Sequence, residues 1–138
     1  MGLITEVTHP MKILGHKAKY VSCGLSYTAF IDLEDYVWVF GSNSHQNLGL
    51  QGVDKLHHPQ KITRVYDEGQ VFNIDFKVRQ VHCSDSVTIF VDLEENLWVT
   101  GDDKFLNIKS EIPARIPRIK ASKVAAGFKH MVVMGYYN

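Results

Sequence analysis

An internal repeat is the feature of this sequence that most constrains the fold. A shift of 60 positions aligns residues 21–41 with residues 81–101 without a gap, and Cys, Thr, Phe, Asp, Leu, Glu, Trp, Val and Gly recur at equivalent positions. A third, partial copy at residues 124–134 matches residues 21–31 in register. Because such units bury their apolar faces against one another, the repeat predicts structural units that stack side by side.

Each of the first two units carries the pattern of a β-hairpin. Residues 28–33 and 37–40 are rich in β-branched and aromatic residues, and the acidic turn 34–36 separates them. The second unit repeats this arrangement, so antiparallel strand pairs are expected. The acid pairs at the two tips could also be compared with paired catalytic carboxylates, but their recurrence with the repeat favours solubilising turns.

Several repeated positions are predicted to be structural. The two tryptophans are expected to fill the space between neighbouring sheets, and a bend or a positive φ is expected at the glycines between strands. The predicted structural positions are Gly24, Trp38, Gly41, Trp98, Gly101 and Gly127.

The linker between the first two units contains an extra element. Residues 64–66 and 70–74 flank Asp67-Glu68-Gly69, which is the pattern of an added hairpin. Insertions of this kind fall on one face of a repeat array, often the binding face.

Size and charge limit the classes of function. The chain has 138 residues and 45% hydrophobic residues, which suits one packed domain. Its 15 basic and 15 acidic residues cancel, so nucleic acid is not expected as a partner. Residues 102–138 nevertheless hold seven basic and three acidic residues, a net charge of +4. This segment is either a solvated basic face or a docking surface for an acidic partner, such as the acidic part of another copy.

Targeting signals are not evident in the sequence. No apolar run reaches the roughly 18 residues of a membrane helix, and the start has no basic region followed by an apolar stretch. Glu6 stands where the myristoylation pattern needs Ser or Thr. An intracellular location, cytoplasmic or nuclear, with no membrane partner is therefore expected.

No catalytic constellation stands out, and the chain is predicted not to be an enzyme and to hold no cofactor. The patterns C-x-x-C, H-E-x-x-H and G-x-S-x-G and a phosphate-binding glycine loop do not occur. Cys23 and Cys83 share a repeat position, so both are expected to be small buried residues. His57 and His58 could join a metal site with His45, but adjacent loop histidines are expected to be solvent-exposed and no metal is predicted.

The combined motifs resemble the regulator of chromosome condensation repeat. The family pattern V-x-x-G-x-x-H-T, then V-W-x-W-G-x-N-x-x-G-Q-L-G and a proline, is similar to residues 21–28, 37–49 and Pro59. The resemblance extends from about Pro10 to Met134.

The chain departs from this pattern at several positions. Tyr27 replaces the preferred His, which His130 keeps in the third unit, and Gln46 replaces a glycine. In the second unit Ser84 replaces Gly and Asp103 replaces Asn. With these changes the chain resembles a degenerate member of the family.

The resemblance implies a β-propeller, a ring usually built of seven four-stranded blades. For this length we expect an all-β partial propeller of stacked antiparallel sheets, with two full blades and an incomplete one. The expected domain is the single repeat domain 1–138, with units at about 10–58, 59–114 and 115–138. Family members differ in activity, and what they share is a loop-bearing face that binds another protein.

The predicted function is a non-catalytic protein–protein interaction or scaffold module. Open sheet edges invite pairing, so the chain is expected to self-associate or to be completed by a partner. Two alternatives remain: a structural component of a larger particle or shell, and a regulator of a small GTPase or of chromatin. The predicted binding residues are Asn43, His45, Gln46, Lys104 and Phe105 in loops after the tryptophan-bearing strands, and Tyr66 and Phe72 in the added hairpin.

Overall fold

The structure is a computed structural model that describes residues 7–136. Within this range the chain forms eleven β-strands and no helix, so the all-β prediction is confirmed. In chain order the strands are β1 (Ala18–Cys23), β2 (Tyr27–Asp32), β3 (Val37–Ser42), β4 (Lys55–Lys61), β5 (Arg64–Asp67), β6 (Gln70–Asn73), β7 (Val78–Cys83), β8 (Val87–Asp92), β9 (Asn96–Asp103), β10 (Ile108–Ala126) and β11 (Met131–Tyr136). The described residues contain no helix able to span a membrane. The features at residues 1–6 on which the targeting expectation rests lie outside the described range.

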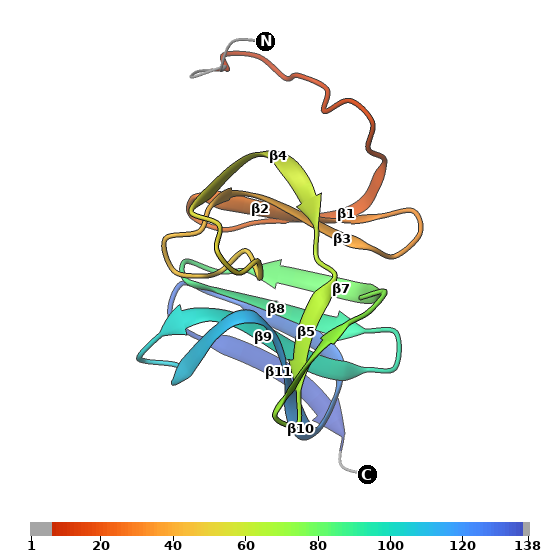
Figure 1. The fold of residues 1–138 in the computed structure, drawn as a ribbon, viewed down its shortest axis with the longest axis vertical. Helices are drawn as coiled ribbons and strands as arrows, with labels where there is room; N and C mark the ends of the chain where they lie inside the picture. Colours follow the sequence, from red (N-terminus) through yellow and green to blue (C-terminus); the bar gives the residue numbers. More distant parts are fainter. Residues whose placement is uncertain (1–6, 137–138) are drawn as a thin grey trace.

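Two sheets stack as layers, as Figure 1 shows. The first sheet is antiparallel, in the order β1-β2-β3-β4. The second sheet has the order β6-β5-β10-β9-β8-β7, and its last four strands, from β10 to β7, repeat the arrangement of the first. The final part of β10 pairs with β11, with Val124 opposite Val133, and these two strands begin the third unit. The predicted partial propeller of two blades and an incomplete third is therefore confirmed.

The added hairpin widens the second sheet. Strands β5 and β6 pair antiparallel, and β5 joins the outer strand β10 in parallel, with Tyr66 opposite Ala114. Arg115 on β10 fastens the tip of the hairpin, because its Nε donates to an Asp67 carboxylate oxygen at 2.7 Å and its Nη2 to Glu68 at 3.1 Å. The hydrogen bond to Asp67 raises the pKa of Arg115, so the guanidinium keeps its charge.

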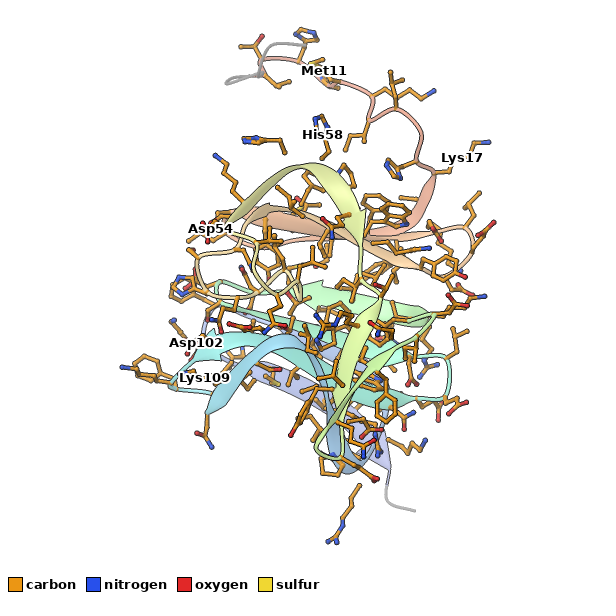
Figure 2. All side chains as sticks on the ribbon, in the orientation of Figure 1. Met11, Lys17, Asp54, His58, Asp102 and Lys109 are labelled. Atoms are coloured by element: carbon orange, nitrogen blue, oxygen red, sulfur yellow. The ribbon has the colours of Figure 1, made fainter. Side chains whose placement is uncertain are left out.

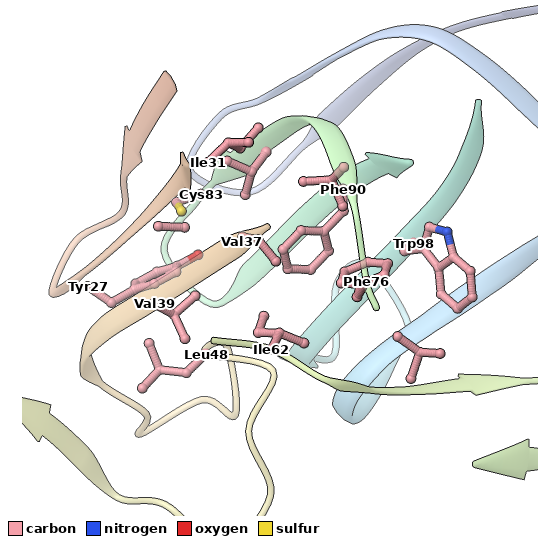
Figure 3. Packing of buried hydrophobic residues seen from close by; sticks show 14 residues of the cluster. Tyr27, Ile31, Val37, Val39, Leu48, Ile62, Phe76, Cys83, Phe90 and Trp98 are labelled. Atoms are coloured by element: carbon pink, nitrogen blue, oxygen red, sulfur yellow. The ribbon is translucent and has the colours of Figure 1, made fainter. Parts of the chain in front are cut away.

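Apolar side chains fill the space between the layers. Strands alternate their side chains between two faces, so each sheet presents one set to the preceding unit and another to the following unit. Figure 3 shows the cluster between the first two sheets, with Ile31, Val37 and Val39 facing Phe90 and Trp98. A second cluster packs the other face of the second sheet against the third unit, through Val87, Ile89, Val91, Leu97, Val99, Ala121 and Val124.

An aspartate and a tryptophan fasten the hairpin turn in each full unit. The Trp38 indole N–H donates to Asp32 at 2.8 Å, and the Trp98 indole N–H donates to Asp92 at 2.9 Å. Burial opposes ionisation of Asp32, but the hydrogen bonds from Trp38 and from two backbone N–H groups outweigh it and lower its pKa. The recurrent Asp and Trp of the sequence therefore form one bonded pair per unit.

The repeated glycines serve two different purposes. Gly41 and Gly101 have positive φ values of 111° and 132°, a region that side chains rarely adopt. Gly24 and Gly127 have no positive φ. A Cβ at Gly24 would instead overlap the Tyr27 ring, and one at Gly127 would overlap the His130 ring. At those two positions glycine leaves room for the aromatic ring of the residue three positions later in the chain.

Two burial predictions need correction at the first unit. Trp98 is buried between sheets, with 5% exposure, but Trp38 is only half-buried because its face of the first sheet has no sheet against it in the described chain. Cys83 is buried, whereas Cys23 is exposed for the same reason. The prediction that both cysteines are buried is therefore wrong for Cys23.

Candidate protein-interaction surfaces

Five loops share one edge of the stacked sheets, which we call the loop edge. They are residues 24–26, 43–54, 84–86, 104–107 and 127–130. The register places them together, since the start of β2 pairs with the end of β3 and the start of β8 pairs with the end of β9. The backbone N–H of Asp102, near the end of β9, donates to the His45 carbonyl at 2.7 Å, which ties loop 43–54 to the second sheet. In Figure 2, Asp54, Asp102 and Lys109 mark this side of the molecule.

The predicted residues of loop 43–54 have different roles. The Asn43 side chain is 8% exposed and holds the loop from inside, since its amide donates to the carbonyls of Leu50 and Val53. Gln46 is partly buried with a positive φ of 57° and donates to Glu111 at 3.2 Å. This positive φ explains why a glycine suits that position of the repeat. His45 is exposed at the surface.

Of the two remaining predicted loop residues, Phe105 belongs to a cluster that we call the aromatic tip, consisting of Phe105, Phe128 and Lys129. Phe105 is 84% exposed and Phe128 is 62% exposed. The Lys129 ammonium lies 5.6 Å from the first ring centroid and 5.1 Å from the second. Lys104, also exposed, precedes Phe105 in the same loop. The structure therefore brings a cation and two exposed aromatic rings together.

Acidic side chains beneath the aromatic tip hold it in place. Lys129 lies 3.4 Å from an Asp85 carboxylate oxygen and 3.5 Å from one of Asp103. Asp103 is buried and accepts hydrogen bonds from the Ser86 hydroxyl and from the backbone N–H groups of Phe105 and Leu106. These hydrogen bonds, with that of Ser86 the largest contribution, lower the pKa of Asp103.

Sequence reasoning missed three surface residues on the loop edge. Leu25 is 75% exposed, and Phe128 and Lys129 complete the aromatic tip. Leu25 and Phe128 both follow a repeated glycine, Gly24 and Gly127. The signal that could have found Leu25 and Phe128 is an apolar residue that recurs at the same position of a predicted loop, because a loop residue does not pack in the core.

The added hairpin separates its two predicted residues. Across β5 and β6, Phe72 lies opposite Val65 and Val71 lies opposite Tyr66. Since side chains of one strand alternate between faces, Tyr66 and Phe72 point to opposite sides of the hairpin. Phe72 lines a groove that runs along the opposite edge of the sheets, near the turn after β8.

The two ends of the stack carry exposed apolar residues. We call the side of the first sheet that bears Val21, Cys23 and Trp38 the front face, and Val21 there is 60% exposed. The rear face belongs to the third unit and carries Val132 and Met134, which are 58% and 59% exposed. In the first unit, the residues at the two equivalent positions are buried against the second sheet.

The described part of the chain contains no cluster of metal ligands, and its buried cysteine is not activated. No group of three or more His, Cys, Asp or Glu residues there is placed to hold a metal ion, and His57 and His58 are exposed on β4. Burial raises the pKa of the Cys83 thiol to about 11, so it stays protonated at neutral pH.

The stacked four-stranded units and their loop edge define a repeat protein of the β-propeller class. Residues 34–91 match the family model described as Regulator of chromosome condensation (RCC1) repeat, so the chain carries an RCC1-type repeat, as the sequence motifs predicted. No curated protein matches the chain in a sequence comparison.

Solved structures share this fold at low sequence identity. Human WBSCR16 superposes with a TM-score of 0.67 and 16% identity over 89% of this chain and 33% of its own. Prp20p from Saccharomyces cerevisiae superposes with a TM-score of 0.70 and 13% identity over 84% of this chain and 30% of its own. A chain in the crystal structure of Kap60 bound to yeast RCC1 (Prp20) superposes with a TM-score of 0.67 and 15% identity over 84% of this chain and 29% of its own. The chain thus spans about a third of the length of these structures.

Proposed function

We propose that the chain is a non-catalytic protein-interaction module whose contact surface is the loop edge. The observation that carries the proposal is the aromatic tip, where two exposed rings flank Lys129. Large exposed apolar side chains are costly to keep in water, and aromatic residues dominate the energetics of protein interfaces. His45 and Lys104 extend the same surface.

Quantitative affinity purification of the tagged chain tests this surface. Phe105→Ala and Phe128→Ala should each reduce recovery of specific partners at least tenfold, because each removes an aromatic anchor. Leu33→Ala is the matched control, since Leu33 is 60% exposed but lies at the opposite edge of the first sheet. Recovery that is unchanged in both phenylalanine variants, with their thermal unfolding intact, would refute the proposal.

We also propose that the end faces make the chain self-associate or join a partner with a matching sheet. Val21 and Cys23 on the front face are exposed, whereas their counterparts Val81 and Cys83 are buried against the first sheet at 0% and 8% exposure. The chain's own sheet-on-sheet contact therefore indicates what kind of surface fits the front face. A scaffold role, or a place in a larger assembly, would use the same faces.

Light scattering coupled to size-exclusion chromatography measures this association directly. A mass that rises with concentration, together with concentration-dependent protection of Cys23 from a thiol reagent, is the expected result. A folded monomer at micromolar concentration with a freely reactive Cys23 would contradict it.

Binding to a small GTPase or to chromatin is a second candidate. Prp20p from Saccharomyces cerevisiae, which shares this fold, has binding properties to Gsp1p and histones. In this chain, the net charge of +4 in residues 102–138 favours an acidic partner. Nucleotide-release assays and salt-dependent binding to nucleosomes test it, and inactivity in both would remove it.

A further inference from the structure

A groove lies apart from the loop edge and from the two end faces. It runs between the added hairpin and the β8–β9 turn, and its volume is about 670 Å³. Pockets of roughly 300–1,000 Å³ are large enough to enclose most of a small ligand or a few side chains. The first unit has the equivalent turn but no added hairpin, so the groove belongs to the second unit alone.

The groove is apolar at its base and along its walls. Phe76 and Trp98, which pack edge to face at 5.4 Å between centroids, form the base. Phe72, Ile74 and Leu93 form the walls and are 42%, 40% and 50% exposed. Exposed apolar side chains that converge on a concave surface provide a place for an apolar group of a ligand.

Carboxylates dominate the charges that line the groove. The four carboxylates of Asp67, Asp75, Asp92 and Glu94 are set against the two cations of Lys77 and Arg115, which leaves an excess of two negative charges. This excess gives the groove an electrostatic preference for cationic groups.

Most of these charges are already engaged. Arg115 is bound to Asp67 and to Glu68 outside the groove, and Asp92 accepts the indole N–H of Trp98. The Lys77 ammonium lies 5.2 Å from the centroid of the Tyr36 ring. Among the described residues, Asp75 and Glu94 have no ion-pair partner. They follow Ile74 and Leu93 directly in the chain, so each free carboxylate lies beside an apolar wall residue.

We propose that this groove binds a short segment of a protein partner that presents one large apolar side chain flanked by Lys or Arg. The apolar side chain packs on Trp98 between Phe72 and Leu93, and the flanking cations pair with Asp75 and Glu94. An acidic segment would bring like charge against those carboxylates, and a purely apolar segment would leave them unpaired. The groove thus selects a partner by a chemistry different from that of the aromatic tip.

Fluorescence anisotropy with a labelled probe peptide tests the proposal on the full chain. The probe is a short Gly/Ser peptide with one phenylalanine between two arginines, and its counterpart carries glutamates in place of the arginines. We expect saturable binding of the first, affinity at least tenfold lower for the second, and weaker binding at high salt. In a Trp38→Phe variant, the remaining Trp98 fluorescence should change on binding.

The repeat supplies a matched control for the charge. Glu94→Lys should lower the affinity for the arginine peptide at least tenfold, while Glu34→Lys, at the equivalent turn of the first unit, should leave it unchanged. Leu93→Ser should also weaken binding, and Phe105→Ala should not, which separates this groove from the loop edge. Absence of binding to the wild-type chain, equal binding of the two peptides, or equal effects of Glu94→Lys and Glu34→Lys would overturn the proposal.

Discussion

Trp38 and Trp98 occupy the same repeat position but meet different surroundings. Each indole binds the aspartate that begins its turn, and each packs edge to face against a ring from the preceding segment. That ring is His16 for Trp38, at 4.6 Å between centroids, and Phe76 for Trp98, at 5.4 Å. Only Trp98 also has the neighbouring sheet over it.

The difference separates what a unit builds by itself from what its neighbour provides. The Asp–Trp hydrogen bond and the edge-to-face ring form within one unit and its preceding segment. Burial of the face, however, needs a second sheet, and it accounts for the contrast between Val81 at 0% exposure and Val21 at 60%. The loss of stability caused by a substitution should therefore depend on whether a neighbouring sheet covers that position, more than on the sequence of the unit itself.

The largest effect is expected from truncating the covered tryptophan. Trp98→Ala should lower the free energy of unfolding by about 3–5 kcal/mol, because it leaves a cavity in the core. Trp38→Ala should cost about 1–2 kcal/mol, since part of that ring is already in water. Urea denaturation followed by circular dichroism measures both. Equal losses would show that the front face is covered in solution.

The next effect distinguishes the two units at the glycine position. Gly24→Ser should lower the free energy of unfolding by about 2–3 kcal/mol, because a Cβ there overlaps the Tyr27 ring and the Ser84 carbonyl. Ser84→Gly should cost about 1 kcal/mol, since it removes only the hydroxyl bonds to the Val87 backbone at 3.0 and 3.2 Å. Thermal unfolding compares the two, and a smaller cost for Gly24→Ser than for Ser84→Gly would contradict the steric explanation.

A smaller effect is expected at the aspartate of the first turn. Asp32→Asn should cost about 1–2 kcal/mol at neutral pH, because it weakens charge-assisted hydrogen bonds from Trp38 and the turn backbone. The folded pKa of Asp32 lies below its ordinary value of 3.8, so its contribution is present above that pH and is lost as the pH falls through the folded pKa. The variant should lose less stability than the wild type on acidification. Midpoints of thermal unfolding recorded from neutral to strongly acidic pH test this, and parallel pH profiles would contradict it.

The smallest effect is expected at the exposed front face. Val21→Thr should change the free energy of unfolding by no more than about 0.5 kcal/mol, as is usual for surface positions. Val81→Thr is the internal comparison, because it buries a hydroxyl in the core. Chemical denaturation at low protein concentration gives both values. A large loss at Val21 would indicate that another sheet covers the front face.

The sequence predicted most of the fold but only part of the candidate surfaces. The hairpins, the third unit and the added strands could be predicted because alternation and turn residues act over a few positions. The equivalence of His16 and Phe76 was missed, although the two residues are 60 positions apart, because they are chemically unlike. The aromatic tip was missed in part because it joins residues from two distant loops.

The sequence by itself determined the repeat, the strands and the acidic turns, because these depend on local periodicity and on residues near one another in the chain. Only the tertiary structure decided which tryptophan is covered, that β5 pairs in parallel with β10, and that Phe72 and Leu93 line one groove. These features depend on which distant surfaces meet, and that is decided by the packing of whole sheets.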